Sequence, residues 1–140
     1  MKVSTKGRYG LRIMVDVAEN GAKPVRISDI SARQEISVKY AEQITGALVK
    51  AKLLKSVRGA LGGYELVKPA ADYTAGEILR ALEGDLVPVD CVNTEYCNRA
   101  EACSTRRFWQ GLYSKINEYL DSFTLQDLVK EGSSADFYQI

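Results

Sequence analysis

The chain has 140 residues, 46% of them hydrophobic and 26% charged, which is the balance of an ordinary soluble globular protein. No apolar stretch approaches the roughly 20 residues that span a bilayer, and no apolar core follows the first lysines. We therefore expect neither a membrane helix nor a signal peptide, and we place the protein in the cytoplasm. Three cysteines are present and histidine is absent, so Ser-His-Asp and Cys-His chemistry are excluded and we expect no enzyme.

The charge is divided unevenly along the chain. Residues 1–69 hold 13 Lys and Arg against 6 Asp and Glu, a balance of +7, whereas residues 70–140 hold 6 against 12, a balance of −6. A basic half joined to an acidic half indicates a module that binds a polyanion such as nucleic acid. Chance can also divide charge in this way, so charge alone leaves both interpretations open.

Three helices are predicted in the first 51 residues. Their expected spans, in chain order, are about 6–20, 29–34 and 38–51, with a short extended link at 25–27. Thr5, Ser28 and Ser37 stand where N-cap residues belong, because their hydroxyls can accept a hydrogen bond from the first turn. Two short capped helices separated by a turn, within residues 28–51, predict a helix-turn-helix.

A β-hairpin and a further helix are predicted next. Two β-prone runs, 53–58 and 64–67, flank a glycine-rich turn. A basic hairpin directly after a helix-turn-helix is typical of the wing of a winged helix. A helix over 75–82, with Thr74 and Glu77 as a capping box, completes the expected DNA-binding domain over residues 1–84.

The second half of the chain has a loop and two predicted helices. Residues 85–104 show little periodicity and hold all the cysteines, which favours a functional loop. An apolar stripe from 105 to 121 predicts a long helix. Thr124 and Asp127 form a capping box for a last short helix, which Gly132 is expected to end. The predicted fold class is therefore mainly α with a small β-hairpin wing.

The second helix of the predicted helix-turn-helix carries a face rich in hydrogen-bonding side chains, namely Ser37, Lys39, Tyr40, Glu42 and Gln43. Lys39 can reach guanine or a phosphate, Gln43 can pair with adenine, and Glu42 can accept from cytosine. Arg58, beside Gly59 at the hairpin tip, is placed to enter an A·T-rich minor groove. A solvated helix face and an ordinary surface arginine are the alternatives, which the N-caps and the hairpin disfavour. Phosphate contacts are expected from Lys2, Lys6, Arg8 and Lys55.

Cys91, Cys97 and Cys103 are separated by five residues each. Thiolates favour zinc, copper(I) or iron–sulfur clusters, and a cluster tolerates wider spacing than a zinc site built from close cysteine pairs. A fourth ligand has to come from an exogenous molecule, a second subunit or a nearby side chain. The nearby candidates are Asp90, Glu95, Glu101, Ser104 and Arg106. Zinc binding and a reversible thiol redox switch remain open beside the cluster.

The chain resembles a known family over nearly its whole length. The residues that carry the resemblance are Ser4-Thr5-Lys6-Gly7-Arg8-Tyr9-Gly10, Ile30-Ser31 through Glu42-Gln43, Val57-Arg58-Gly59 with Gly62-Gly63-Tyr64, the three cysteines, and Thr124-Leu125 with Leu128-Val129. Together they are similar to the IscR-type regulators, bacterial winged-helix repressors of iron–sulfur cluster assembly genes.

The resemblance implies a homodimer on a double-stranded DNA operator. Residues 105–140 would form a dimerisation helix and a tail, with the helix near Phe108 to Leu120 crossing its partner. The three cysteines would hold a 2Fe–2S cluster, with 4Fe–4S as the alternative, so that residues 85–104 form a cluster loop. Glu42 would discriminate between two operator classes, of which the cluster-free protein keeps one.

One position departs from the pattern of that family. Well-known members carry a histidine ligand three residues after the last cysteine, where this chain has Arg106. Related branches sense nitric oxide, iron or cysteine supply, and a cluster-independent repressor is a further alternative. A plain adaptor that uses the long helix without selective DNA binding is the remaining one.

Overall fold

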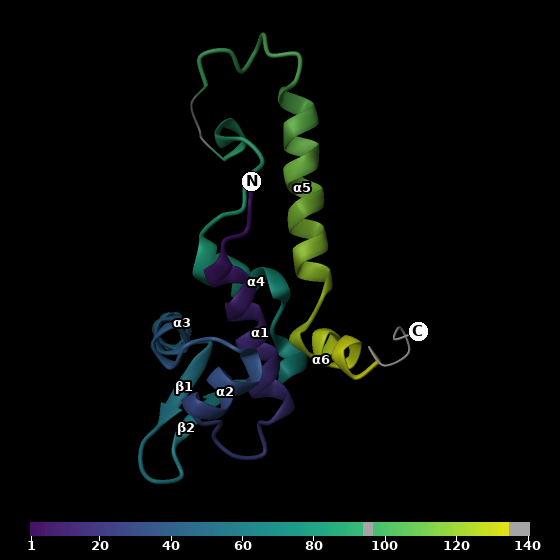
Figure 1. Ribbon diagram of the computed structural model, residues 1–140. Coiled ribbons are helices and arrows are strands. Elements are labelled where there is room, and N and C mark those ends of the chain that lie inside the picture. The colour runs from purple at the N-terminus through teal and green to yellow at the C-terminus, as the bar shows by residue number, and fades with distance from the viewer. Residues whose placement is uncertain (94–96, 135–140) are drawn as a thin grey trace.

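The first two-thirds of the chain packs around its first helix (Figure 1). The computed structural model describes residues 1–93 and 97–134. The elements of this part are α1 (Thr5–Glu19), α2 (Ile27–Gln34), α3 (Val38–Lys50), β1 (Leu54–Val57), β2 (Gly63–Leu66), η1 (Ala70–Asp72) and α4 (Ala75–Glu83). Ile13, Met14 and Val17 of α1 are fully buried, as are Ile44 and Leu48 of α3. These apolar side chains hold the helices at fixed angles.

The two strands form the predicted hairpin. They pair antiparallel, with Leu54 opposite Leu66 and Val57 opposite Gly63. Val25, just before α2, adds an isolated antiparallel bridge to Tyr64, so the link between α1 and α2 lies along the hairpin. A Cβ at Gly63 would come within 2.3 Å of the Val25 carbonyl oxygen, and this close approach requires glycine.

The remaining elements are η2 (Asp90–Val92), α5 (Arg106–Ser122) and α6 (Leu125–Ser134). Short α6 packs against α1, and Leu125 at its start is fully buried. Helix α5 projects from the body, and the segment with the cysteines lies at its far end, opposite the wing (Figure 1). Every residue of the 17-residue α5 keeps at least partial exposure.

The predicted fold class, mainly α with a β-hairpin wing, agrees with this architecture. The prediction for Ser37 is confirmed, because its Oγ accepts from the backbone N–H of Tyr40 at 3.0 Å. Thr124 and Asp127 form the complete capping box, since each side chain accepts from the other's backbone N–H. At α4 the Thr74 hydroxyl accepts from the N–H of Glu77, whereas the Glu77 carboxylate pairs with Lys68.

Three predicted helix boundaries are wrong. Ser4, and not Thr5, caps α1, because α1 begins one residue early. Ser28 lies inside α2, whose N-cap position is taken by Arg26, since the Val25–Tyr64 bridge ends the extended link there. Gly132 lies within α6 instead of ending it, and Ser133 and Ser134, predicted as the beginning of the tail, are helical. Residues 135–140 of the predicted tail fall outside the described residues. None of the helices in the described ranges combines the length and apolar character that crossing a bilayer requires.

Candidate DNA interface and cysteine segment

Helix α3 separates a buried face from a polar one. Ala41, Ile44 and Leu48 point into the core, whereas three of the predicted reading residues, Lys39, Glu42 and Gln43, are exposed. The Ser37 cap fixes the start of the helix, where a recognition helix places its base-contacting side chains. The structure therefore brings the predicted reading residues together on one accessible face.

Tyr40, the remaining residue of that face, is held by α1. Its ring meets Tyr9 edge-on, with centroids 6.0 Å apart and planes at 79°. The Arg12 guanidinium carbon also lies 4.8 Å from the Tyr9 ring centroid. These aromatic and cation–π contacts leave Tyr40 half-buried, and they orient the one large side chain of the reading face.

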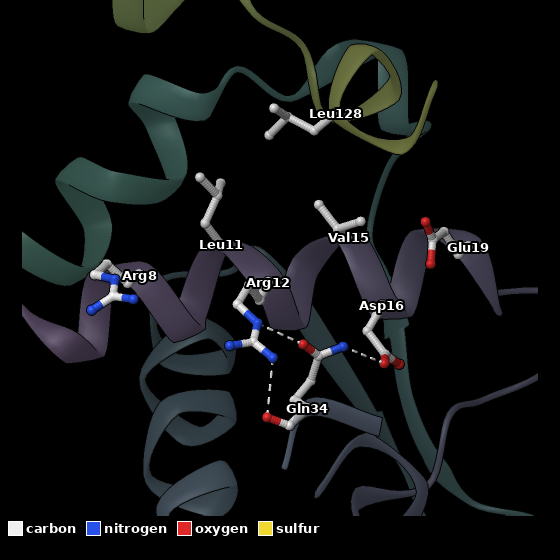
Figure 2. Close-up of a pocket in the computed structure, with 8 residues that line it drawn as sticks. All are labelled: Arg8, Leu11, Arg12, Val15, Asp16, Glu19, Gln34 and Leu128. Carbon is white, nitrogen blue, oxygen red and sulfur yellow. Dashed lines mark hydrogen bonds between the residues drawn. The ribbon is translucent and has the colours of Figure 1, made fainter. Parts of the chain in front are cut away.

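A polar network continues from Arg12 and joins α1 to α2 (Figure 2). Arg12 donates from Nε to Gln34 Oε1 at 2.9 Å and from Nη2 to the Gln34 carbonyl at 3.1 Å. The Gln34 amide in turn donates to Asp16, which is only 2% exposed. Arg33 donates two bonds to the same carboxylate, at 2.9 and 2.7 Å, and this pairing raises the pKa of the Arg33 guanidinium. A buried carboxylate is thus fully bonded where the two helices meet.

The wing is fixed at its base and exposed at its tip. Tyr73, fully buried, donates from its hydroxyl to the Leu53 carbonyl at 2.7 Å and accepts from the Val67 N–H at 2.9 Å. These two groups lie just outside the two strands, so the tyrosine clamps the hairpin where it leaves the body. Arg58 is exposed, and the following Gly59 has φ of +110°, a conformation that favours glycine.

The cysteines are spread along one segment. Cys91 lies in η2, Cys97 directly before the turn at 98–102, and Cys103 three residues before α5, and all three are half-buried thiols. The Thr105 hydroxyl lies 3.4 Å from Cys103 Sγ. Hydrogen bonding by that hydroxyl, aided by the backbone N–H groups at the start of α5, lowers the pKa of the Cys103 thiol.

The structure does not gather these thiols into a metal site. Among residues 1–93 and 97–134, no three Cys, Asp or Glu side chains lie close enough together to hold a metal ion. Of the predicted fourth ligands, Asp90, Glu101 and Ser104 are exposed, and Arg106 donates to the Ala100 carbonyl at 3.5 Å. Glu95 lies outside the described residues. Thiolates are suitable ligands for an iron–sulfur cluster. In the positions that the structure gives them, however, the three thiols could bind one cluster only after the segment rearranges.

Carboxylates anchor the beginning of the cysteine segment. The Glu83 carboxylate accepts from the N–H groups of Ser4 and Gly7, at 3.1 and 3.0 Å, and from the Ser4 hydroxyl. Asp85 accepts from the Tyr113 hydroxyl at 2.6 Å, which raises the pKa of that phenol. The end of α4, which leads into the segment, is thereby tied to α1, and the beginning of the segment is tied to α5.

Several of these residues escaped the sequence analysis. The side chains of Asp16, Tyr73 and Glu83 find distant partners in the fold. Arg33 lies 17 residues from Asp16, Leu53 lies 20 from Tyr73, and Ser4 lies 79 from Glu83. No local pattern marks such residues. The helical spacing of Asp16 between Ile13 and Val17 was the one available signal, because it places a charge on a buried face.

Comparison with known proteins shows the family. The Rrf2 model, described as an iron-dependent transcriptional regulator, matches residues 3–131. The protein rrf2 of Nitratidesulfovibrio vulgaris is 41% identical over 135 residues, which are 95% of this chain and 90% of that protein. The solved structure of CymR, the global cysteine regulator of B. subtilis, has a TM-score of 0.80 at 40% identity and covers 94% of this chain and 98% of its own. The solved structure of T. potens IscR has a TM-score of 0.77 at 40% identity, and the match covers 100% of this chain and 92% of that chain.

The matched family and the CymR structure are those of regulators and not of enzymes, as the sequence predicted. The resemblance to IscR-type regulators and the winged-helix fold are both confirmed. The chain belongs to the Rrf2 family of iron-dependent transcriptional regulators.

Proposed function

We propose that this Rrf2 regulator is a cytoplasmic, homodimeric repressor of iron–sulfur cluster biogenesis genes, whose operator choice is tuned by an iron–sulfur cluster. The proposal that the protein binds DNA rests on one observation: polar side chains are exposed both on α3 and on the wing that follows it. Lys39, Glu42 and Gln43 are exposed on a helix capped by Ser37, and Arg58 is exposed on the hairpin that follows.

Helix α3 reads the major groove in this proposal, and the wing reads the adjacent minor groove. Lys39 and Gln43 supply donors for guanine and adenine edges, and Glu42 accepts from cytosine and repels sites that present an acceptor there. The Gly59 turn lets the backbone approach the sugar-phosphate strands while Arg58 enters a narrow A·T-rich groove. Base choice and groove shape are then read by different elements.

The exposed face of α5 supports the homodimer. Phe108 and Tyr119 are 64% and 67% exposed, and Leu112 and Ile116 continue the same apolar stripe. A stripe of this kind on a helix that projects from the body favours association with the same helix of a second copy. Such a dimer would present two α3 helices about 34 Å apart, one turn of DNA.

Cys91, Cys97 and Cys103 would hold the cluster. When bound, it supplies thiolate-ligated iron that is lost on oxidation or iron shortage. Cys103 lies three residues before α5, so a ligand set that includes it connects the cysteine segment to the proposed dimer helix. The fourth ligand is proposed to be an oxygen donor such as Glu101 or Ser104, both exposed near Cys103, and such a ligand would make the cluster easier to lose.

A second candidate is a repressor that responds to cysteine supply through its thiols. The TM-score of 0.80 to CymR favours it, as does the arrangement of three thiols not gathered into a site. The lowered pKa of Cys103 increases its thiolate fraction, which makes that thiol a candidate for oxidation.

The test is an iron and sulfide count with a visible spectrum on anaerobically purified protein, followed by operator titration. The proposal expects stoichiometric iron and an operator affinity that changes about five- to 150-fold when the cluster is removed. Colourless protein that binds identically after replacement of all three cysteines by serine would overturn the cluster. Colourless protein whose binding changes on oxidation, and recovers with a thiol reductant, would favour the second candidate.

A further inference from the structure

A hollow lies between the beginning of α2 and the wing. It has a volume of about 440 Å³ and is lined by residues 26–28 on one side and by residues 56–60 and 62–64 of the hairpin on the other. Its two charged lining residues are arginines, Arg26 and Arg58, and all the others are neutral. A concave site with this charge attracts an anion.

The walls of the hollow are held together by hydrogen bonds. The backbone N–H of Val25 donates to the Tyr64 carbonyl, and that of Tyr64 to the Val25 carbonyl, both at 2.8 Å. Arg26 Nη2 donates across to the Ala60 carbonyl at the wing tip, at 2.5 Å. The guanidinium is therefore fixed over the hollow. Since this group has five N–H donors, it can bind an anion while keeping its bond to the wing.

In the described part of the chain, the Arg26 side chain makes no hydrogen bond or ion pair besides its bond to Ala60. It stands at the N-cap position of α2, yet its side chain makes no capping hydrogen bond among the residues that the structure describes. The Ser28 and Ser56 hydroxyls are exposed on the opposite walls and can donate to the same anion. An arginine and two hydroxyls around one hollow are a donor set suited to a phosphate group.

The hollow connects the two parts proposed to read DNA. Arg58 is one of its lining residues, and α2, which forms the other wall, packs against α3. A major groove and the adjacent minor groove are separated by one sugar-phosphate strand. If α3 and Arg58 enter neighbouring grooves, that strand has to cross the surface between them.

We propose that this hollow is a phosphodiester-binding site for the operator strand between the two grooves, with Arg26 as its principal ligand. The inference deepens the proposed function and rests on it. By holding Ala60 as well, Arg26 would set the position of the wing tip on that strand, so the phosphate contact and the entry of Arg58 into the minor groove are linked.

The first test is operator titration of the full-length protein over a salt series. In Arg26→Gln, the slope of log affinity against log salt should fall by about 0.9 for each subunit. For a dimer, the wild type would then lose about 12-fold more affinity than the variant between about 50 and 200 mM salt. The loss should be equal on operators that differ only in the bases contacted by α3, because a phosphate contact carries no sequence information.

Two further variants separate charge from geometry. Arg26→Lys keeps the charge and should retain most of the salt slope, while weakening the A·T preference that depends on the fixed wing tip. Lys130→Gln removes the same charge from α6, away from the wing, and should leave the slope unchanged. Circular dichroism melts of all variants check that the fold is retained.

The second test neutralises single operator phosphates by methylphosphonate substitution. One position between the two contacted grooves should weaken wild-type binding and have no further effect on Arg26→Gln. An unchanged salt slope in Arg26→Gln, or an undiminished effect of that phosphate on the variant, overturns this inference while leaving the proposed function standing. Wild-type protein without selective operator binding would instead sink the proposed function itself.

Discussion

Two parts of the molecule differ in how completely one chain buries and pairs their side chains. The first is the body of α1–α4 with the hairpin, which is proposed to read DNA, and the second is the cysteine segment with α5. In the first, Ile13, Ile44 and Leu48 are fully buried and the Asp16 carboxylate is fully bonded. In the second, α5 keeps every residue at least partly exposed, and the described part of the cysteine segment gathers no metal site. A single chain therefore completes the part proposed to read DNA, whereas it leaves the part proposed to sense a signal with an exposed apolar helix and no metal site among the described residues.

This difference indicates where regulation can enter. A rigid reading part responds to a distant signal only through the few contacts that join the two parts. They include the bond of Tyr113 to Asp85, the pairing of Arg80 on α4 with Asp121 on α5, and the backbone bonds that join Tyr73 and Ala75 to residues 123–125. The comparison can be broken in the cysteine-bearing part, in the α1–α4 body and at the junction between them, in decreasing order of the expected effect.

The largest effect is expected from Leu112→Glu in the apolar stripe of α5. Leu112 is 37% exposed in one chain, so the monomer tolerates the change, whereas a dimer would bury two unpaired carboxylates. We expect the dimer dissociation constant to rise by about 100-fold or more, an increase that corresponds to about 3 kcal/mol. Analytical ultracentrifugation measures it, and operator affinity should fall in parallel.

The matched control is Ser114→Glu, which adds the same charge to an exposed position off the stripe of the same helix. It should leave the dimer intact. If both variants dimerise like the wild type, α5 is not the interface, and the exposed stripe needs another explanation.

A smaller effect is expected in the α1–α4 body from Asp16→Asn. The substitution keeps the shape of the side chain but replaces a charged acceptor of three hydrogen bonds, two from Arg33 and one from Gln34. We expect the free energy of unfolding to fall by about 1.5–3 kcal/mol, measured by urea denaturation at fixed protein concentration. The control is Glu19→Gln, an exposed change on the same helix, which should lower the free energy of unfolding by less than about 0.5 kcal/mol. Equal stability of the two variants would show that the network adds nothing.

The same division describes what the sequence could predict. Helix α3 and the hairpin follow from local signals, namely the Ser37 cap and the glycine-rich turn, because these act within a few residues. Serine is a more favourable N-cap residue than arginine, so the sequence predicts that Ser28 caps α2. This prediction is wrong because Val25 pairs with Tyr64, 39 residues away in sequence, and this pairing decides where α2 begins.

The cysteine segment shows the opposite limit. Spacing and ligand chemistry identify Cys91, Cys97 and Cys103 as candidates for one site, since thiolates bind the same soft metals wherever they meet. The described residues do not bring these thiols into one metal site, and the beginning of the segment is held by a long-range bond, since Asp85 accepts from a tyrosine 28 residues away. Residue types therefore predict what a site can bind, whereas the long-range contacts decide whether a single chain assembles it.

The smallest predicted effect lies at the junction, where Arg80 of α4 donates to both oxygens of Asp121 on α5, at 2.8 and 3.0 Å. This pairing lowers the pKa of Asp121 from its ordinary 3.8. Because the folded pKa is depressed, the stabilisation is complete above the ordinary value and is lost as pH falls through it to the lowered one. Asp121→Asn should therefore be less stable than the wild type at pH 7, and the difference should vanish under acid.

The difference at pH 7 should stay below about 1 kcal/mol, since the pair is partly exposed and Arg80 also bonds Asn117 of α5 at 2.8 Å. Thermal melts at pH 7 and over a series of acidic pH values measure the difference, and titration of the other carboxylates affects the wild type and the variant alike. Asp72→Asn, an exposed change on η1, serves as the control. A difference that persists unchanged at low pH would mean that Asp121 acts through its shape and not its charge. The two parts of the chain would then be joined at α4 and α5 by packing instead of by this ion pair.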